Sequence, residues 1–290
     1  MMHSQGINKE IIFVADTQAP IWVETLVLKN RGNVKATELI LQNIVDKKPG
    51  CVFFLGDLVS LGYLSSAWKL IDNYVEKMKS NNIAVHAIMG NHELMARYRT
   101  GERNFQKRFP DHIRTGYCKI IDSIAVILLN SNFSRMTLTE QKQQDEWYHN
   151  IMLQLEKDEE IKAIVVGTHH PPYSNSLLVG FSKEVQQRFV PPYIKCSKAV
   201  LFITGHSHAF EYFKTEEKDF IIIGGGGGLA HPLSKKVGRF EDMADCYKPF
   251  FHYLSIKRNE DHLLITSNRL KDDFSGFEIG YEMNSKLNCN

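Results

Sequence analysis

The sequence has 290 residues, of which 43% are hydrophobic and 23% charged, as is ordinary for a folded globular protein. Its formal net charge of +2 is too small to favour nucleic acid or an anionic membrane as the main partner. The five cysteines are scattered without a C-x-x-C pair, which argues against a disulfide framework and favours a reducing compartment. Because residues 1–9 are polar and no apolar run is long enough to span a membrane, we expect a cytoplasmic protein without a membrane partner.

The first half of the chain alternates between short apolar runs and segments with helical periodicity. Its expected elements, in order, are a strand at 10–15, a helix at 34–47, a strand at 51–55, a helix at 67–80 and a strand at 85–89. A basic segment at 97–108 follows, and we interpret it mainly as the solvated face of a helix. This alternation is typical of an α/β fold.

The second half begins with strands at 117–121 and 124–129 joined by a two-residue turn, followed by a helix that we expect to begin at Thr139. The remaining expected elements are strands at 163–166 and 201–204, a short helix at 181–189 before Pro191-Pro192, strands at 210–214 and 220–223, and a hairpin of 251–256 with 262–267. We therefore predict an α/β/β/α sandwich of two mixed sheets flanked by helices. We expect a single domain over 1–270 and a loosely ordered tail over 271–290.

Five of the expected strands end in a small residue that is followed by side chains able to hold a cation. The five segments are Asp16-Thr17-Gln18, Gly56-Asp57, Gly90-Asn91-His92-Glu93, Gly167-Thr168-His169-His170 and Gly205-His206-Ser207-His208. Ligands of open α/β sheets bind outside the carboxyl ends of the strands. Carboxylate, amide and imidazole groups are common metal ligands. The pattern therefore predicts a metal centre.

These segments resemble, in order, the signature blocks of the calcineurin-like metallophosphoesterases, and the resemblance extends from Asp16 to His208. It implies two metal ions that share Asp57 and activate a bridging hydroxide, which attacks a phosphate ester directly without a covalent intermediate. The residues implied for one metal are Asp16, Gln18, Asp57 and His208. Those implied for the other are Asp57, Asn91, His169 and His206.

The resemblance also implies roles around the substrate. His169 matches the family's ligand position better than His170 does. His92 cannot face the metals if Asn91 does, so it is suited to contact the phosphoryl oxygens or to protonate the leaving group. The expected catalytic residues are Asp57 and His92. The expected substrate contacts are Asn91, His92, His170, Arg97 and Arg99.

Two departures from the family pattern are informative. Most relatives have His at the position of Gln18. The amide of Gln18 is a weaker metal ligand than imidazole, and the alternative is that Gln18 only forms a hydrogen bond to a metal ligand. The substitution favours Mn or Fe, with Zn still possible. Ser60-Leu61 replaces both the Tyr of the purple acid phosphatases and the Asp-Arg of the Ser/Thr protein phosphatases. Since the segments at His169 and His206 look more like the acid-phosphatase and general phosphoesterase branches, a close protein-phosphatase relationship is not expected.

The primary prediction is a phosphomonoesterase. One alternative is a phosphodiesterase acting on cyclic nucleotides or nucleic acid, and another is a degenerate scaffold that keeps the fold without catalysis. The five glycines 224–228 lack the Lys-Ser/Thr of a P-loop, so we expect them to let the backbone pass close to the metal site. We expect Glu93 to brace its loop rather than to bind metal.

Overall fold

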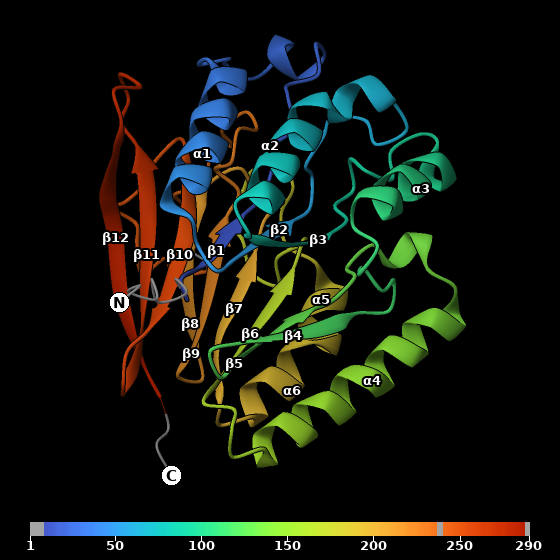
Figure 1. Cartoon of the computed structure of the whole chain (residues 1–290), viewed down its shortest axis with the longest axis vertical. Helices are drawn as coiled ribbons and strands as arrows, with labels where there is room; N and C mark the ends of the chain where they lie inside the picture. The colour runs from blue at the N-terminus through green and yellow to red at the C-terminus, as the bar shows by residue number, and fades with distance from the viewer. Residues whose placement is uncertain (1–8, 237–239, 288–290) are drawn as a thin grey trace, which may run out of the picture.

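The computed structural model describes residues 9–236 and 240–287, and its strands form two six-stranded sheets (Figure 1). The first sheet has the order β12-β11-β10-β1-β2-β3 and the second the order β4-β5-β6-β7-β9-β8. In the first sheet the strands are β1 Ile11–Val14, β2 Cys51–Leu55, β3 Ala84–Ile88, β10 His252–Arg258, β11 His262–Leu270 and β12 Phe277–Lys286. In the second they are β4 Tyr117–Ile121, β5 Ile124–Leu128, β6 Ala163–Thr168, β7 Ala199–Thr204, β8 Phe210–Thr215 and β9 Lys218–Ile223.

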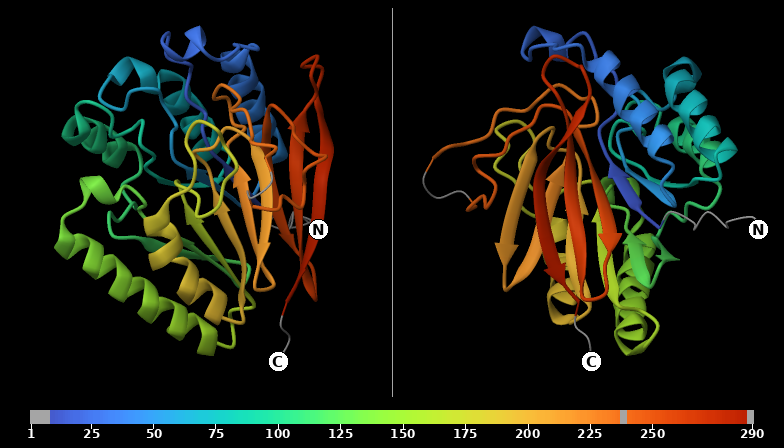
Figure 2. Two further views of the ribbon diagram at one scale, coloured as in Figure 1. Left: turned by 180° about the vertical axis from the view of Figure 1, so that it is seen from behind. Right: turned by 60° about the vertical axis from the view of Figure 1, so that its left-hand side comes forward.

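Helices cover the outer face of each sheet (Figure 2). The first sheet carries α1 Asn33–Lys47, α2 Lys69–Ser80 and α3 Tyr98–Arg108, and the second carries α4 Leu138–Lys157, α5 Lys183–Arg188 and α6 Val190–Lys195. Three short 3-10 turns are η1 Glu24–Leu26, η2 Ser65–Trp68 and η3 Phe133–Arg135. No helix among the described residues combines the length and apolarity needed to cross a bilayer.

A continuous apolar core lies between the two sheets and is built from both of them. Phe13 and Leu55 of the first sheet pack there with Val165 of the second, and all three are fully buried. Two further cores lie between each sheet and its helices. The layers are therefore helix, sheet, sheet and helix, which confirms the predicted α/β/β/α sandwich.

Parallel pairing brings the functional segments together at one edge of the sandwich. β1, β2 and β3 run parallel, and so do β5, β6, β7 and β9. The two sheets are joined at this edge by the glycine segment, where the N–H of Gly226 donates to the Ala15 carbonyl at 3.0 Å. The N–H of Gly228 donates to the Asp16 carbonyl at 2.8 Å. A Cβ on Gly228 would lie 2.5 Å from His208 Nδ1, so this close approach requires glycine.

The helices of the second half differ from the prediction in two informative ways. α4 begins at Leu138 because Thr137, rather than Thr139, is its N-cap. The Thr137 hydroxyl accepts from the Glu140 N–H at 3.2 Å, and the Glu140 carboxylate accepts from the Thr137 N–H at 2.7 Å, which completes a capping box. The short helix expected at 181–189 is present as α5, but a second helix, α6, follows it and was not predicted. Pro191 and Pro192 lie in the first turn of α6, where a missing N–H has no cost.

The expected loose tail is wrong for residues 277–286, which form the edge strand β12. β12 pairs antiparallel with β11 over most of its length. Phe277, Ile279, Tyr281 and Met283 alternate with polar residues or glycine, and Tyr281 and Met283 pack against the core between the sheets. This period of two is the signal of a half-buried strand.

Candidate metal centre

Asp16, Asp57 and His206 each follow a strand and hold a left-handed backbone, with φ of 60°, 50° and 67°. Such angles are uncommon for residues other than glycine and cluster at functional sites. The Asp16 N–H donates to the Gly56 carbonyl at 3.1 Å, and the His206 N–H donates to the Asp16 carboxylate at 2.9 Å. The three turns are thus joined to one another.

Gly56 allows the turn that follows β2 to lie directly against the segments that carry Gly90 and His169. Its φ is +91°, and a Cβ there would lie 2.6 Å from both the Gly90 nitrogen and His169 Nδ1. Both distances are far below contact, so any side chain would push the turn that carries Asp57 away from the next loop. The glycine before the aspartate therefore positions the carboxylate.

One group of candidate ligands consists of Asp16, Asp57 and His208, whose ligand atoms lie within 4.8 Å of one another. His208 Nδ1–H donates to the Leu229 carbonyl at 2.8 Å, which leaves Nε2 facing Asp16 Oδ1 at 3.5 Å. A backbone partner for the second ring nitrogen is the usual arrangement of a metal-binding histidine. Burial lowers the pKa of His208, but the Asp16 carboxylate outweighs it and raises that pKa.

Gln18 lies beside this group. Its amide fits its neighbours when Nε2 donates to the Asp57 carbonyl at 2.8 Å and to the Asp16 carbonyl at 3.2 Å. This orientation turns Oε1 toward His208 Nε2 at 3.1 Å. The oxygen accepts a hydrogen bond there when His208 is protonated, and it is directed at the same atoms as Asp16 and His208, so Gln18 is placed to be a ligand.

A second group surrounds His169. Its Nδ1–H donates to the Leu55 carbonyl at 2.9 Å, and its Nε2 lies 3.1 Å from Asn91 Oδ1 and 3.2 Å from Asp57 Oδ2. The ligand nitrogens of His169, His170 and His206 lie within 4.8 Å of one another. Asp57 therefore lies between the two groups, as a shared ligand must.

The charges in the centre suit cations. Asp16 and Asp57 are 0% and 1% exposed, and two buried carboxylates this close need a compensating positive charge. Burial disfavours the ionised Asp57, yet the facing imidazoles of His169 and His92 hold its pKa well below the ordinary value. Burial lowers the pKa of His206 well below its ordinary value, helped by His170 and His169. A neutral imidazole offers the lone pair that a metal requires.

His92 lies at the side of this centre and is oriented by the main chain. Its Nδ1–H donates to the Ser60 carbonyl at 2.9 Å, and its Nε2 lies 4.0 Å from Asp57 Oδ2 and 4.0 Å from Glu24 Oε1. The main-chain carbonyl of Ser60, and not its side chain, therefore orients the His92 ring. Burial lowers the pKa of His92, but Asp57 and the Ser60 carbonyl outweigh it and raise that pKa.

Glu93 is fully buried and braces two loops, not only its own. Its carboxylate accepts four backbone N–H groups at 2.7 to 3.2 Å, those of Asp57, Leu58, Val59 and Gly90. Burial raises the pKa of Glu93 to about 7. The four N–H groups act in the opposite direction because only the ionised form accepts at both oxygens. Glu93 therefore fixes the turn of the shared aspartate.

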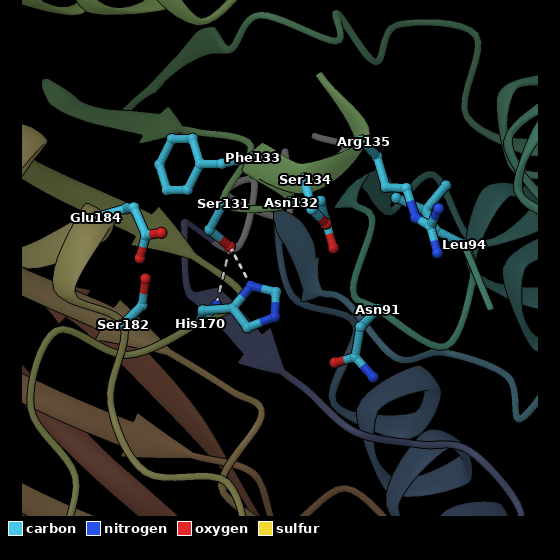
Figure 3. A pocket seen from close by; sticks show the side chains of 10 residues that line it. All are labelled: Asn91, Leu94, Ser131, Asn132, Phe133, Ser134, Arg135, His170, Ser182 and Glu184. Atoms are coloured by element: carbon cyan, nitrogen blue, oxygen red, sulfur yellow. Dashed lines mark hydrogen bonds between the residues drawn. The ribbon is translucent and has the colours of Figure 1, made fainter. Parts of the chain in front are cut away.

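A pocket of about 290 Å³ opens beside the His169 group (Figure 3). Of the residues expected to contact substrate, Asn91 and His170 line it. Arg97 and Arg99 do not line it: both are exposed, and their guanidinium groups lie over the rings of Tyr63 and Tyr98. The arginine of the pocket is Arg135 on η3.

Two further pocket residues, Ser131 and Asn132, were not predicted from the sequence. Ser131 Oγ lies 2.8 Å from His170 Nδ1 and accepts the His170 N–H at 3.0 Å, and Asn132 Nδ2 donates to the Met89 carbonyl at 2.9 Å. Both residues follow β5, as the other polar segments follow their strands. The same pattern of a buried strand followed by polar residues could have identified them.

Replacing Gln18 with Ala is expected to weaken retention of one metal by roughly tenfold to a hundredfold, the range typical of lost contacts around a metal site. Metal analysis after dialysis against graded chelator would measure this. Gln154→Ala removes an exposed glutamine from α4 and is the matched control. Equal metal content in both variants would contradict a role for Gln18 in the centre.

Three solved structures share this fold at 13% identity each. GAP50, the anchor in the inner membrane complex of Plasmodium, has a TM-score of 0.70, with 97% of this chain and 89% of that chain covered. A purple acid phosphatase from yellow lupin (Lupinus luteus) seeds has a TM-score of 0.69, with 94% and 53% covered. A dimetal phosphatase from Danio rerio has a TM-score of 0.61, with 97% and 99% covered.

No curated protein matches the chain. The family model of the calcineurin-like phosphoesterases matches residues 9–210, a span that holds every residue of the two ligand groups. This match covers more than half of the chain and agrees with the resemblance of the five segments. The chain therefore belongs to the calcineurin-like phosphoesterases and is a metal-dependent phosphoesterase.

Proposed function

We propose that this phosphoesterase hydrolyses a phosphomonoester by direct attack of water, without a covalent enzyme intermediate. The observation that carries the proposal is the position of the Asp57 carboxylate, which lies within 4.8 Å of the Asp16 and His208 ligand atoms and 3.2 Å from His169 Nε2. A shared carboxylate is the means of holding two cations close together. When bound, the two cations would offset the charge on the phosphoryl oxygens and lower the pKa of a water molecule.

We assign the ligands as the family resemblance implies. The proposed first set is Asp16, Gln18, Asp57 and His208, and the proposed second set is Asp57, Asn91, His169 and His206. Much of this donor set is carboxylate or amide oxygen, which favours Mn or Fe over Zn. The four cysteines among the described residues, Cys51, Cys118, Cys196 and Cys246, are free, which supports our proposal of a cytoplasmic location.

His92 is the proposed general acid. The hydrogen bond from Nδ1–H to Ser60 fixes the ring, and the raised pKa of His92 favours the protonated form that a proton donor needs. A proton delivered from Nε2 to the departing oxygen would avoid an alkoxide leaving group. The pocket lined by Asn91 and His170 would receive that leaving group.

The decisive experiment compares p-nitrophenyl phosphate with bis(p-nitrophenyl) phosphate on the purified protein supplied with Mn²⁺. We expect faster hydrolysis of the monoester and two metal ions per chain. Faster hydrolysis of the diester would favour the phosphodiesterase alternative, with cyclic nucleotides or nucleic acid as substrates. The order of the two rates therefore decides between the two activities.

The similar GAP50 structure is described as an anchor, so a scaffold function is the second candidate. It predicts a chain that binds no metal and hydrolyses neither substrate with any divalent cation. Retained metal without hydrolysis would overturn the phosphomonoesterase proposal while leaving the metal centre intact. These outcomes separate binding of the ions from their use in catalysis.

A further inference from the structure

The pocket beside the candidate metal centre has walls of opposite charge. Arg135 lies on one side of it and Glu184 on the other, with the Phe133 ring and the hydrogen-bonded Ser131–His170 pair between them (Figure 3). His170 borders both the pocket and the ligand nitrogens of His169 and His206. A phosphate ester held at the metal centre would therefore extend its leaving group between these walls.

Arg135 is free to bind a ligand. Arg108, Arg114 and Arg188 are each paired with a carboxylate. Within the described part of the chain, the Arg135 guanidinium contacts no carboxylate and lies 5.3 Å from the centre of the Tyr98 ring. The guanidinium of Arg99 lies 5.7 Å from the same ring and donates to the Tyr98 hydroxyl at 3.1 Å, so two cations flank Tyr98 at this side of the pocket.

The main chain holds Arg135 at this position. Its carbonyl accepts a hydrogen bond from the guanidinium of Arg114, which also pairs with Glu140 at 3.0 Å. Gln141 Nε2 donates to the Phe133 carbonyl at 3.0 Å. The turn η3 is thus tied to the first turn of α4, which fixes the backbone that carries the guanidinium.

The opposite wall disfavours an anion. Glu184 is exposed at the start of α5, and Ser182 beside it caps the helix by accepting the Val185 N–H at 3.2 Å. A carboxylate on this side repels an anionic group and accepts hydrogen bonds from hydroxyl or ammonium groups. The two walls together therefore give a bound leaving group a fixed orientation.

We propose that the substrate is a phosphomonoester whose leaving group carries a second oxyanion, a carboxylate or a further phosphate, which Arg135 binds. The inference rests on the proposed phosphomonoesterase activity and names its substrate class. A guanidinium matches the geometry of both oxyanions and can form two parallel hydrogen bonds with either. Arg99 adds positive potential on the same side.

The test pairs substrates that differ in the second oxyanion. 3-Phosphoglycerate is compared with glycerol 3-phosphate for the carboxylate, and fructose 1,6-bisphosphate with fructose 6-phosphate for the phosphate. We expect the native chain to favour the doubly anionic member of at least one pair. Arg135→Gln should lower kcat/KM for that member at least about tenfold while leaving its partner within about twofold. Whichever pair responds identifies the second group as carboxylate or phosphate.

Arg103→Gln is the matched control, because Arg103 lies on α3 outside the pocket and its guanidinium bonds to Arg99 and Thr100. This variant should leave the preference intact. Hydrolysis of all four substrates without a preference, or an equal loss on all four in Arg135→Gln, would overturn the substrate class while leaving the phosphomonoesterase function standing. A native chain that hydrolyses none of them, nor p-nitrophenyl phosphate, would instead refute the phosphomonoesterase function.

Discussion

Replacing Asp57 with Asn is expected to lower kcat/KM for p-nitrophenyl phosphate at least about a hundredfold, because the transition state loses charge stabilisation by the metal centre. The Asp57 carboxylate is 1% exposed and accepts the His92 N–H at 2.8 Å. The amide keeps the size of the side chain but loses the charge that can be shared by two cations. Metal analysis should show fewer than two ions per chain.

The matched control for this prediction is Asp72→Asn. Asp72 lies on α2 and pairs with Arg108 at 2.5 Å, and it belongs to neither group of candidate ligands. This variant should keep both metal ions and the native rate. A native rate in Asp57→Asn would refute the shared carboxylate, and a native metal content with a reduced rate would assign Asp57 to catalysis alone.

The ends of the strands were predictable because a buried strand is apolar and the residues that follow it here are glycine and metal-binding types. This change in residue type can be recognised in the sequence alone. A fully buried strand such as β2 is a continuous apolar run, and it ends where glycine and aspartate begin. Parallel pairing then brings such ends to one edge whatever the loops between them do. For this reason Asp16, Asp57, His169 and His208 come together as expected.

Contacts made through the main chain were not predictable from residue types. The ring of His92 is oriented by the carbonyl of Ser60, and every residue has a carbonyl, so the identity of residue 60 carries no signal for this role. Arg135 was missed for a different reason. It lies in a 3-10 turn 43 residues after His92, and only the packing of η3 against α4 brings it to the pocket.

The alternation of apolar and polar residues in strand β12 is easily overlooked because the segment as a whole is rich in polar residues. Its apolar residues alternate at 277, 279, 281 and 283, but Ile279 is exposed and only Tyr281 and Met283 pack on the core between the sheets. Gly280 and the acidic side chains between them lower the apolar content of the segment. An edge strand needs only one apolar face, and charge on the other face protects the edge from unwanted pairing. Alternation is therefore a better guide than mean hydropathy for such a strand.

Replacing Glu93 with Gln is expected to lower the free energy of unfolding by roughly 3 to 5 kcal/mol, because an amide group would face two backbone N–H donors that then lose their acceptor. The four donors belong to the loops that follow β2 and β3. For a chain of this size the melting temperature should fall by roughly 6 to 15 °C. Thermal unfolding at pH 8, where the native carboxylate is ionised, would measure the change.

Loss of this brace should reach the metal centre as well. Glu93 fixes the N–H groups of Asp57 and Leu58, so its loss should loosen the turn that holds the shared carboxylate. We therefore expect weaker metal retention in Glu93→Gln even at temperatures where the chain is folded. Glu38→Gln, which changes an exposed carboxylate on α1, should alter neither property. A native melting temperature with both metals retained in Glu93→Gln would show that the four hydrogen bonds are dispensable and that Gly56 alone sets the turn.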